Sequence, residues 1–270
     1  MSAPLISVVV PTRNSARTLA ACLAHIRRQT YPRVELIVVD NGSDDGTLGL
    51  ARQLADRVEQ HGPERSAQRN RGYAVAAGEL IAFIDSDQLL EPDVLAQAAT
   101  VSAQDAGVGG IVIPELALGV GFLAGCRALE KQLYLGDARV EAARIFTRRA
   151  LAEVEGYDES ILAGEDWDLA DRVRRAGFRI GRTTAACWHD EGQVSLRACF
   201  IKKRYYGRSL ALYYRTGSSP RPVVRPALLS DPRRLARHPS RTAGLFLLKA
   251  VEGAGLALGA LDARRGRTSA

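Results

Sequence analysis

Short apolar runs alternate with amphipathic stretches through the first part of the chain. The runs at residues 6–10, 34–39 and 80–84 consist largely of Val, Ile and Leu, which is typical of strands buried on both faces. Between them, apolar residues recur at helical spacing over residues 19–26, and a turn-rich loop leads into a predicted helix over residues 47–57. Strands that alternate with helices predict an α/β fold with a largely parallel sheet.

Polar residues follow each of the three predicted strands. They are Pro11, Thr12 and Asn14 after the first strand, Asp40 after the second, and Asp85, Ser86 and Asp87 after the third. In open parallel sheets, ligands bind outside the carboxyl ends of the strands. We therefore expect these three polar clusters to converge on one crevice.

Asp85 and Asp87 are separated by one residue, so in an extended chain both carboxylates point to the same face. The spacing alone leaves two explanations open. Asp and Ser are common in solvated turns, and the pair would then need no ligand. Two carboxylates are also hard oxygen ligands, suited to a divalent cation that bridges to phosphate.

The second half of the chain is less regular. Residues 108–123 are apolar but contain a proline, a glutamate and several glycines, which favours core strand and loop over a membrane span. Helical spacing returns after residue 150, and the helix that contains Leu169 and Val173 is expected to stop at Gly177.

A Pro- and Arg-rich stretch at residues 218–239 is expected to link the main domain to a final helix over residues 243–261. This helix is apolar apart from Lys249 and Glu252, and it contains four glycines. Two charges in mid-segment make it marginal as a transmembrane span. Three arrangements stay open: a helix packed on the domain or a partner, an interfacial membrane helix, and a true span.

Charge is distributed unevenly along the chain. The formal net charge is +7, but residues 197–270 contain 16 Lys and Arg against 3 Asp and Glu, a net +13, which leaves −6 for residues 1–196. A basic tail fits an anionic membrane surface or an anionic, lipid-linked substrate. Nucleic acid is disfavoured, because no nucleic-acid motif accompanies the charge. We expect a main domain at residues 1–200 and a basic helical extension, with a membrane-associating role, at residues 201–270.

Four cysteines are too few and too scattered for a disulfide framework. They are Cys22, Cys126, Cys187 and Cys199, and they include no C-x-x-C pair. This usage favours a reducing cytoplasm. Together with the basic tail, it predicts a cytoplasmic protein with peripheral contact at the inner face of the cell membrane.

Six segments occur in order over residues 6–190. They are S-V-V-V-P-T-R-N, Q-T-Y-P, E-L-I-V-V-D-N-G-S-D-D-G-T, A-Q-R-N-R-G, A-F-I-D-S-D and G-E-D-W-D-L. As an ordered set they resemble the family 2 glycosyltransferases of the GT-A fold. The resemblance implies a Rossmann-like, mostly parallel sheet flanked by helices, with the C-terminal helical extension added to it. It also implies inverting transfer of a sugar from a nucleotide-diphosphate sugar to an acceptor hydroxyl, in cell-surface or lipid-linked glycan synthesis.

The resemblance implies a nucleotide-sugar site at the strand ends and in the segment E-R-S-A-Q-R-N-R-G at residues 64–72. The residues concerned are Pro11, Thr12, Asn14, Asp40, Arg65, Arg69, Asn70, Asp85 and Ser86. Asp40 would accept a hydrogen bond from the base, a role that suits a carboxylate, although a turn cap is the alternative. Arginines bind phosphate oxygens through a bidentate fork, so Arg65 and Arg69 would contact the diphosphate; an exposed helix face with ordinary ion pairs is the alternative.

A metal ion and a general base are implied as well. Asp85 and Asp87 would hold Mg²⁺ or Mn²⁺ against the diphosphate, with Asp87 as the more direct ligand. His189 would supply a third ligand through a neutral ring nitrogen, or else be structural. Asp166 would remove the proton from the acceptor hydroxyl, and Glu165 would orient the acceptor.

Other functions fit the sequence less well. A sugar-phosphate nucleotidyltransferase needs a glycine-rich loop after the first strand, and a dinucleotide-dependent oxidoreductase needs G-x-G-x-x-G; neither motif is present. An inactive nucleotide-sugar-binding scaffold has no need of both metal aspartates and a base. The segment K-K-R-Y-Y-G-R-S at residues 202–209 either contacts a phosphate of donor or acceptor, or faces a membrane surface.

Overall fold

The computed structural model describes residues 3–208, 226–229 and 231–267 of the 270-residue chain. The chain divides into two compact units, each assembled from separate segments. The first unit comprises Met1–Glu115, Glu141–Glu159 and Glu165–His189, and the second comprises Leu116–Val140, Ser160–Gly164 and Asp190–Ala270. The domain boundary expected at residue 200 stays a prediction, which would be tested by whether the two parts fold independently.

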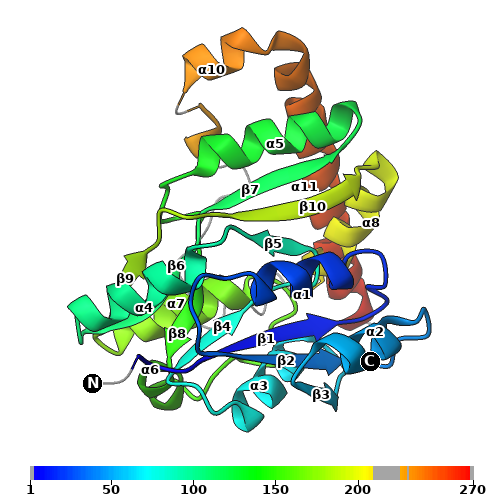
Figure 1. Cartoon of the computed structure of the whole chain (residues 1–270). Helices are drawn as coiled ribbons and strands as arrows, with labels where there is room; N and C mark the ends of the chain where they lie inside the picture. The colour runs from blue at the N-terminus through cyan, green and yellow to red at the C-terminus, as the bar shows by residue number, and fades with distance from the viewer. Residues whose placement is uncertain (1–2, 209–225, 230, 268–270) are drawn as a thin grey trace. The chain divides into compact units, whose positions relative to one another are not determined.

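A seven-stranded sheet lies at the centre of the first unit, in the order β3-β2-β1-β4-β8-β6-β9 (Figure 1). Its strands are β1 (Ile6–Thr12), β2 (Val34–Asp40), β3 (Arg57–Gln60), β4 (Leu80–Phe83), β6 (Val108–Val112), β8 (Ala143–Thr147) and β9 (Arg179–Arg182). Neighbouring strands are parallel except at β8, which runs antiparallel to both β4 and β6. The predicted α/β fold with a mostly parallel sheet is confirmed.

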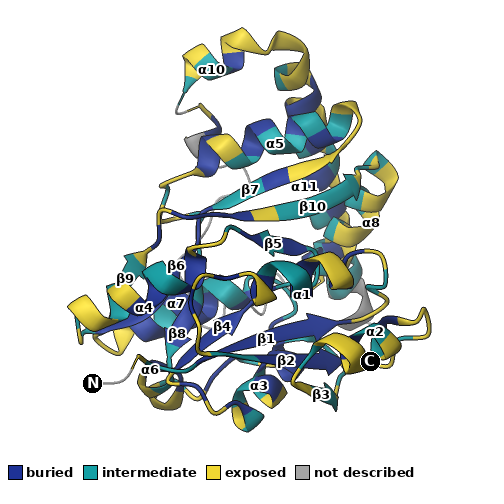
Figure 2. Ribbon diagram, in the orientation of Figure 1, coloured by how far each residue is buried: buried dark blue, intermediate teal, exposed yellow. Residues whose placement is uncertain are grey.

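The register of the sheet explains why the polar clusters meet. Thr12 at the end of β1 lies opposite Asp40 at the end of β2, and Val9 lies opposite Phe83 at the end of β4. All of β1 is buried, as its unbroken apolar run requires (Figure 2). The carboxyl ends of β1, β2 and β4 therefore share one edge of the sheet.

Helices cover both faces of this sheet. Val8 and Val10 of β1 pack with the buried residues of α1 (Leu19–Arg27), α2 (Thr47–Leu54) and α4 (Val94–Gln104). Val9 points to the opposite face and packs with α6 (Arg148–Glu153) and α7 (Glu165–Arg175), while α3 (Arg65–Val75) lies against β1 and β2. This alternation is the two-residue period of a strand buried on both sides.

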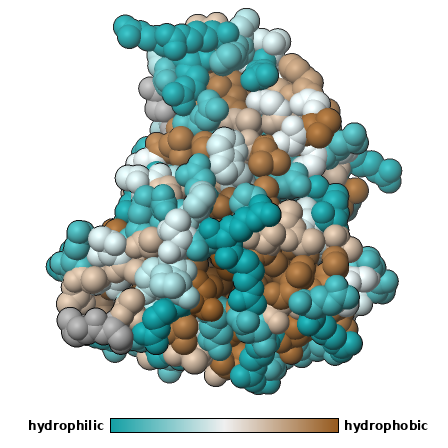
Figure 3. All heavy atoms as spheres, in the orientation of Figure 1, coloured by the Kyte–Doolittle hydropathy of each residue, from teal (hydrophilic) through white to brown (hydrophobic). Residues whose placement is uncertain are grey.

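The second unit is mainly helical. Its helices are α5 (Phe122–Tyr134), α8 (Leu196–Gly207), the short 3-10 helix η1 (Pro226–Leu229), α10 (Pro232–Arg237) and α11 (Pro239–Arg267). Leu129 and Leu133 of α5 share a buried cluster with Leu245 and Leu248 of α11. The surface over α10 is hydrophilic (Figure 3). Among the described residues, α11 alone is long and apolar enough to cross a membrane, judged by length and composition.

Three further strands complete the list. β5 (Gln88–Leu90) pairs antiparallel with the first three residues of β10 (Cys187–Gln193), so that His189 lies opposite Gln88. Both of these segments belong to the first unit. β7 (Glu115–Val120) begins at the last residue of the first unit's long segment.

Three expectations about secondary structure need correction. The helix predicted over residues 47–57 ends at Leu54, and the short polar strand β3 follows it; an exposed edge strand has no apolar pattern to reveal it. The predicted linker at 218–239 contains η1 and α10, whereas residues 218–225 and 230 lie outside the described residues. The final helix extends beyond 243–261 at both ends. The predicted stop at Gly177 is confirmed by its φ of 89°.

Candidate functional site

A tight turn carries Asp85, Ser86 and Asp87 away from the end of β4. The fully buried Gln88 closes it, since its side-chain Oε1 accepts from the backbone N–H of Asp85 at 3.0 Å and its own backbone N–H donates to the Asp85 carbonyl at 2.9 Å. Ser86 Oγ donates to Ser15 Oγ at 2.9 Å. The turn leaves the two aspartates with different partners.

Asp87 faces His189. The Nε2 atom of His189 lies 3.0 Å from Asp87 Oδ2, and its Nδ1 atom lies 3.0 Å from Glu115 Oε1. Burial by itself lowers the pKa of His189, but the hydrogen bonds with Asp87 and Glu115 outweigh it and raise the pKa to about 10. The imidazole therefore holds a proton between two carboxylates.

The Asp87–His189 pair has the donors that a divalent cation needs. Asp87 Oδ1 is buried and has no hydrogen-bond partner among the described residues, and a cation would satisfy it. With Glu115 accepting from Nδ1–H, Nε2 of a neutral His189 is free to act as a ligand. Within residues 3–208, 226–229 and 231–267 no group of three or more His, Cys, Asp or Glu could hold a metal ion. The pair fits a metal whose other ligands are diphosphate oxygens and water.

Arg69 of α3 holds three carboxylates at once. It is completely buried, and its Nη2 lies 2.7 Å from Asp85 Oδ1. Its Nη1 lies 3.1 Å from Glu165 Oε1 and 3.0 Å from Asp166 Oδ1. The diphosphate contact expected of Arg69 stays a prediction, because in this structure both terminal nitrogens are already engaged.

Arg144 of β8 binds the opposite sides of the same carboxylates. Its Nη1 lies 3.2 Å from Asp85 Oδ2 and 3.2 Å from Asp166 Oδ2, and its Nη2 lies 3.6 Å from Glu115 Oε2. Burial raises the pKa of Asp85, but Arg144, Arg69 and then Arg65 outweigh it and hold the pKa well below its usual range. Arg144 thus connects the candidate metal pair to the candidate base.

Glu165 and Asp166 open α7, where the helix N-terminus favours negative charge. Tyr157 Oη donates to Asp166 Oδ1 at 3.0 Å, and the Tyr157 ring lies under the Arg69 guanidinium at 5.1 Å. Burial and then the charge of Asp166 raise the pKa of Glu165. The two neighbouring acids are therefore held in different electrostatic environments.

The residues expected at the nucleotide lie at the ends of β1 and β2. Pro11 and Thr12 are buried, and Thr12 Oγ1 donates to Asp40 Oδ1 at 3.1 Å. Asp40 is completely buried and also accepts from the backbone N–H of Ser43 at 2.9 Å, so it anchors the turn that follows β2. Asn14 has a φ of 52° and accepts from the Asp44 N–H at 3.1 Å. The contact of Asp40 with a base stays a prediction.

Arg65 and Asn70 lie on α3. The half-exposed Arg65 places Nη2 3.4 Å from Glu165 Oε1. Asn70 forms two hydrogen bonds with the backbone of Tyr157. Its Nδ2 donates to the carbonyl and its Oδ1 accepts from the N–H, both at 2.9 Å. Asn70 therefore fixes the residue that donates to Asp166, and its contact with the donor substrate stays a prediction.

Sequence reasoning missed three residues of this cluster, namely Glu115, Arg144 and Tyr157. Arg144 precedes Ile145, which pairs with Ala82 of β4 across a long sequence separation. Glu115 follows Pro114, in the stretch at residues 108–123 where the sequence favoured core strand and loop but contained no motif. Arg144 is positioned by the insertion of β8 into the sheet and Glu115 by the start of β7, and no local sequence pattern predicts either position.

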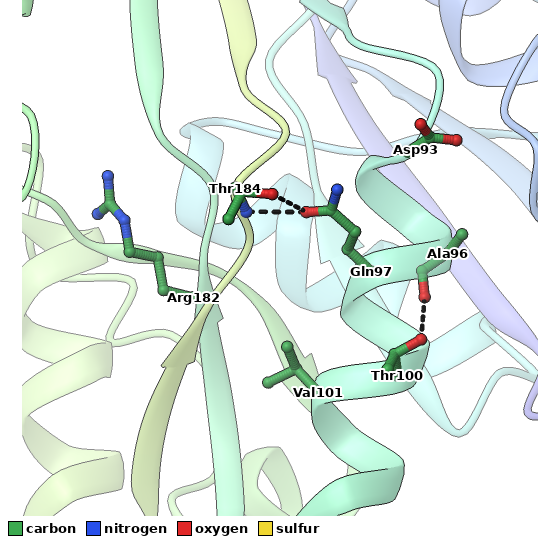
Figure 4. A pocket seen from close by; sticks show the side chains of 7 residues that line it. All are labelled: Asp93, Ala96, Gln97, Thr100, Val101, Arg182 and Thr184. Carbon is green, nitrogen blue, oxygen red and sulfur yellow. Dashed lines mark hydrogen bonds between the residues drawn. The ribbon is translucent and has the colours of Figure 1, made fainter.

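A hollow of about 410 Å³ lies elsewhere in the first unit, beside α4 (Figure 4). Its lining residues are Asp93, Ala96, Gln97, Thr100, Val101, Arg182 and Thr184. Gln97 Oε1 accepts from both the backbone N–H and the hydroxyl of Thr184, at 2.8 and 3.0 Å, and so braces this wall. No residue of the cluster lines this hollow, and we assign it no role.

Comparison with known proteins identifies the family. Residues 7–114 match the model of Glycosyl transferase family 2. The PGL/p-HBAD biosynthesis glycosyltransferase of Mycobacterium tuberculosis is 33% identical over 182 residues, which are 63% of this chain and 69% of that protein. EpsH of Bacillus subtilis is 36% identical over 103 residues, 36% of this chain and 30% of EpsH, so the chain spans under a third of that relative.

Solved structures share the fold. The mannosyltransferase PcManGT from Pyrobaculum calidifontis, in complex with GDP-Man and Mn²⁺, has a TM-score of 0.60 and 24% identity over 97% of this chain and 81% of that one. Glucosyl-3-phosphoglycerate synthase from Mycobacterium tuberculosis, with Mn²⁺, UDP and its product, has a TM-score of 0.55 and 20% identity over 80% and 81%. The chain has the GT-A fold and belongs to glycosyl transferase family 2.

Proposed function

We propose that this protein is an inverting glycosyltransferase that moves a sugar from a nucleotide-diphosphate sugar to an acceptor hydroxyl with the help of Mg²⁺ or Mn²⁺. The observation that carries the proposal is the joined cluster at the end of β4, in which Arg144 connects the Asp87–His189–Glu115 group to Asp166. The relatives support it, since several are named glycosyltransferases and two neighbours hold a nucleotide with Mn²⁺.

The charge balance of the cluster supports a cation. The acidic members are Asp85, Asp87, Glu115, Glu165 and Asp166, and the basic members are Arg65, Arg69 and Arg144. With a neutral His189, the acids exceed the bases by two formal charges, which one divalent cation would offset. A diphosphate adds negative charge of its own, and buried charge without a counterion is costly.

Asp87 and His189 would hold the metal, and Glu115 would fix the orientation and tautomer of His189 through Nδ1. When bound, the ion would neutralise the charge that develops on the departing nucleoside diphosphate. Asp85 is left out of this pair, because Arg69 and Arg144 occupy its two oxygens. In this proposal Asp85 instead keeps the two arginines in place.

Asp166 would act as the base. Its Oδ1 accepts from Arg69 and Tyr157, which fixes the rotation of the carboxylate. Its Oδ2, 3.2 Å from Arg144, retains a lone pair that can accept the proton of the acceptor hydroxyl. The acceptor oxygen would then attack the anomeric carbon from the face opposite the diphosphate, which inverts the configuration. Glu165, the buried neighbour of Asp166, would help to orient the acceptor.

We further propose a glycan or lipid-linked acceptor and a cytoplasmic location. The basic composition of residues 197–270 suits an anionic acceptor, and the four cysteines are free thiols, as a reducing compartment would leave them. No observation favours nucleotidyl transfer. The inactive scaffold is the alternative that the turnover experiments below exclude or support.

The decisive test is nucleotide binding with and without metal. UDP and GDP should raise the melting temperature of the full chain in the presence of Mn²⁺ and much less after chelation, because a ligand that binds the folded state stabilises it by mass action. Asp87→Asn should remove the Mn²⁺-dependent part, while Asp93→Asn, outside the cluster, should behave like the unmodified protein. Equal nucleotide affinity with and without Mn²⁺ would rule out the metal role.

A further inference from the structure

Two charged residues in the middle of α11, Lys249 and Glu252, point inward, in contrast to an ordinary surface helix. Glu252 is buried, and its Oε1 lies 2.6 Å from Arg127 Nη2 of α5. Lys249 forms ion pairs with Glu130 of α5 and with Glu252. Two cations and two anions therefore pair between α5 and α11, and Glu191, 3.9 Å from Arg127 Nε, and Lys203, which interacts with Glu252, add one charge of each sign, so the network is balanced within the second unit.

Close helix packing fixes the rotation of α11. Gly255 and Gly259 face α8, and a Cβ at Gly255 would lie 2.6 Å from the carbonyl oxygen of Phe200. A Cβ at Gly259 would collide with the carbonyl of Arg204. The charge pairs with α5 and the glycine contacts with α8 fix the rotation of α11 about its axis. They therefore determine which residues of α11 face away from α5 and α8.

The outward side of α11 is entirely apolar over residues 243–261. Its exposed residues in this range are Ala243, Phe246, Leu247, Ala250, Ala254, Ala257, Leu258 and Leu261. They recur three or four residues apart, so they form one stripe about 27 Å long at the usual helical rise. Phe246, Leu247, Leu258 and Leu261 are each 43–50% exposed. We call these eight residues the apolar stripe.

Such a stripe is the reverse of what a helix on a soluble domain shows. A surface helix normally buries its apolar face and exposes its polar face. Here Lys249 and Glu252 in mid-helix are inside and the large apolar side chains are outside, and a contiguous exposed apolar surface marks an interaction site. Phe122 of α5 is also exposed, and its ring lies close to Gly244 of α11. The apolar surface therefore continues from α11 onto α5.

Cations accompany the apolar stripe. On the neighbouring α8, the exposed residues include Arg197, Lys202 and Ile201, and the C-cap Arg208 is exposed as well. Arg233 and Arg237 are exposed on α10. An apolar surface among cations matches the interface of a bilayer with anionic headgroups, where acyl chains meet negative charge.

We propose that the apolar stripe is a membrane-docking surface, with α11 lying flat in the headgroup region of an anionic bilayer. A second copy of this chain is a poorer partner, because residues 197–270 carry a formal charge of +13 and two such surfaces repel. A true span is also a poorer arrangement, because it would draw the Lys249–Glu252 network and its α5 partners into the hydrocarbon. The docking surface does not depend on the proposed transfer reaction.

Vesicle co-sedimentation of the full chain tests this proposal. We expect binding to vesicles of phosphatidylcholine with phosphatidylglycerol, weaker binding to phosphatidylcholine alone, and loss of the difference in high salt. The double variant Phe246→Glu with Leu258→Glu should bind about tenfold or more weakly, since it puts two charges into the stripe. Leu54→Glu is the matched control, because Leu54 is an exposed leucine on α2 of the first unit, and it should bind normally.

A gain-of-signal variant keeps the test valid if the double variant folds poorly. Phe246→Trp introduces an exposed indole, whose emission should shift to the blue on anionic vesicles and be quenched by brominated lipid. Four results would overturn the proposal: no vesicle binding by the unmodified chain, unchanged binding by the double variant, resistance of the bound protein to alkaline carbonate as for a true span, or a dimer in solution that the double variant converts to monomers without any vesicle binding.

Discussion

Each unit of the molecule contains one buried cluster of arginines and carboxylates, and the two clusters differ in charge balance. In the second unit, Arg127 and Lys249 meet Glu130 and Glu252, two against two. In the first unit, five acids face three arginines, and Asp87 Oδ1 is buried without a hydrogen-bond partner. The balanced cluster joins two helices, whereas the acidic one lies at the strand ends where ligands bind.

The difference indicates what each cluster is for. A buried ion pair adds little net stability over an apolar core, but the loss of one partner leaves a costly unpaired charge. A balanced network therefore fixes helix register and needs nothing further. In the metal-free first cluster the protonated His189 reduces the acidic excess to one, and Asp87 Oδ1 still has no hydrogen-bond partner among the described residues, so we expect this cluster to respond to metal and substrate and the second to respond to neither.

Among variants that distinguish the two clusters, Asp166→Asn should have the largest effect. Asparagine keeps the shape and can still accept from Arg69 and Tyr157, but it cannot take up the acceptor proton. We expect kcat to fall by roughly 10² to 10⁴, the usual contribution of a general base. Release of the nucleoside diphosphate from a donor sugar in the presence of acceptor measures it, and donor binding by thermal shift should stay near normal.

Glu130→Gln is the matched control in the second unit. It removes one carboxylate from a buried arginine network, as Asp166→Asn does, and should lower stability while leaving kcat near normal at a temperature where the variant is folded. If Asp166→Asn retains more than about a tenth of the rate, Asp166 is not the base.

Removal of an arginine from each cluster should give the next largest effect. Arg127→Met leaves Glu130 and Glu252 with Lys249 alone, and we expect the free energy of unfolding to fall by about 3–5 kcal/mol. Arg144→Met should also destabilise, because it leaves Asp85 and Asp166 with Arg69 alone. Denaturant titrations should show Mn²⁺ restoring part of the loss in Arg144→Met and none in Arg127→Met. Equal responses of the two variants to Mn²⁺ would contradict the distinction between the clusters.

The sequence predicted one part of the acidic cluster well and another part not at all. Asp40, Asp85 and Asp87 each end an apolar run, and the edge where parallel strands end is set by topology, so their convergence followed from pattern alone. Arg144 depends on β8, which enters the sheet antiparallel between β4 and β6. That pairing joins residues some sixty positions apart, and nothing local specifies it.

Side-chain roles were harder to predict than positions. Arg69 was expected to face a diphosphate, and the motif gave no indication that three carboxylates surround it. The charges of α11 were taken as a mark against a membrane span, whereas the structure pairs both with α5. In both cases the partner comes from a distant segment, and a sequence pattern records the residue but not its partner.

The balanced cluster should make stability depend on acid. Burial raises the pKa of Glu252, but Arg127 and then Lys249 outweigh it and lower the pKa from 4.5 to about 2. The folded state therefore binds this proton less readily than the unfolded state, so the stabilisation is complete above pH 4.5 and is lost as the pH falls toward 2. Between pH 5 and pH 3 this group should account for about 2 kcal/mol of lost stability. The free energy of unfolding, measured by urea titration, should fall more steeply with decreasing pH in the unmodified chain than in Glu252→Gln. The same pH dependence in both proteins would refute the linkage.

The smallest effect should come from Glu115→Gln, which tests whether Glu115 acts through His189 rather than on substrate. Glutamine can still accept from Nδ1–H of His189 but lacks the charge that makes Nε2 a better ligand, so we expect Mn²⁺ affinity to fall by roughly tenfold. A purely structural residue would not produce this pattern, in which activity returns to nearly the unmodified kcat once Mn²⁺ is saturating. Glu91→Gln, on the turn after β5 and outside the cluster, is the control. If kcat stays low at saturating Mn²⁺ while the metal affinity is unchanged, Glu115 acts through Arg144 and the base instead. Asp87 and His189 would then bind the metal without help from Glu115.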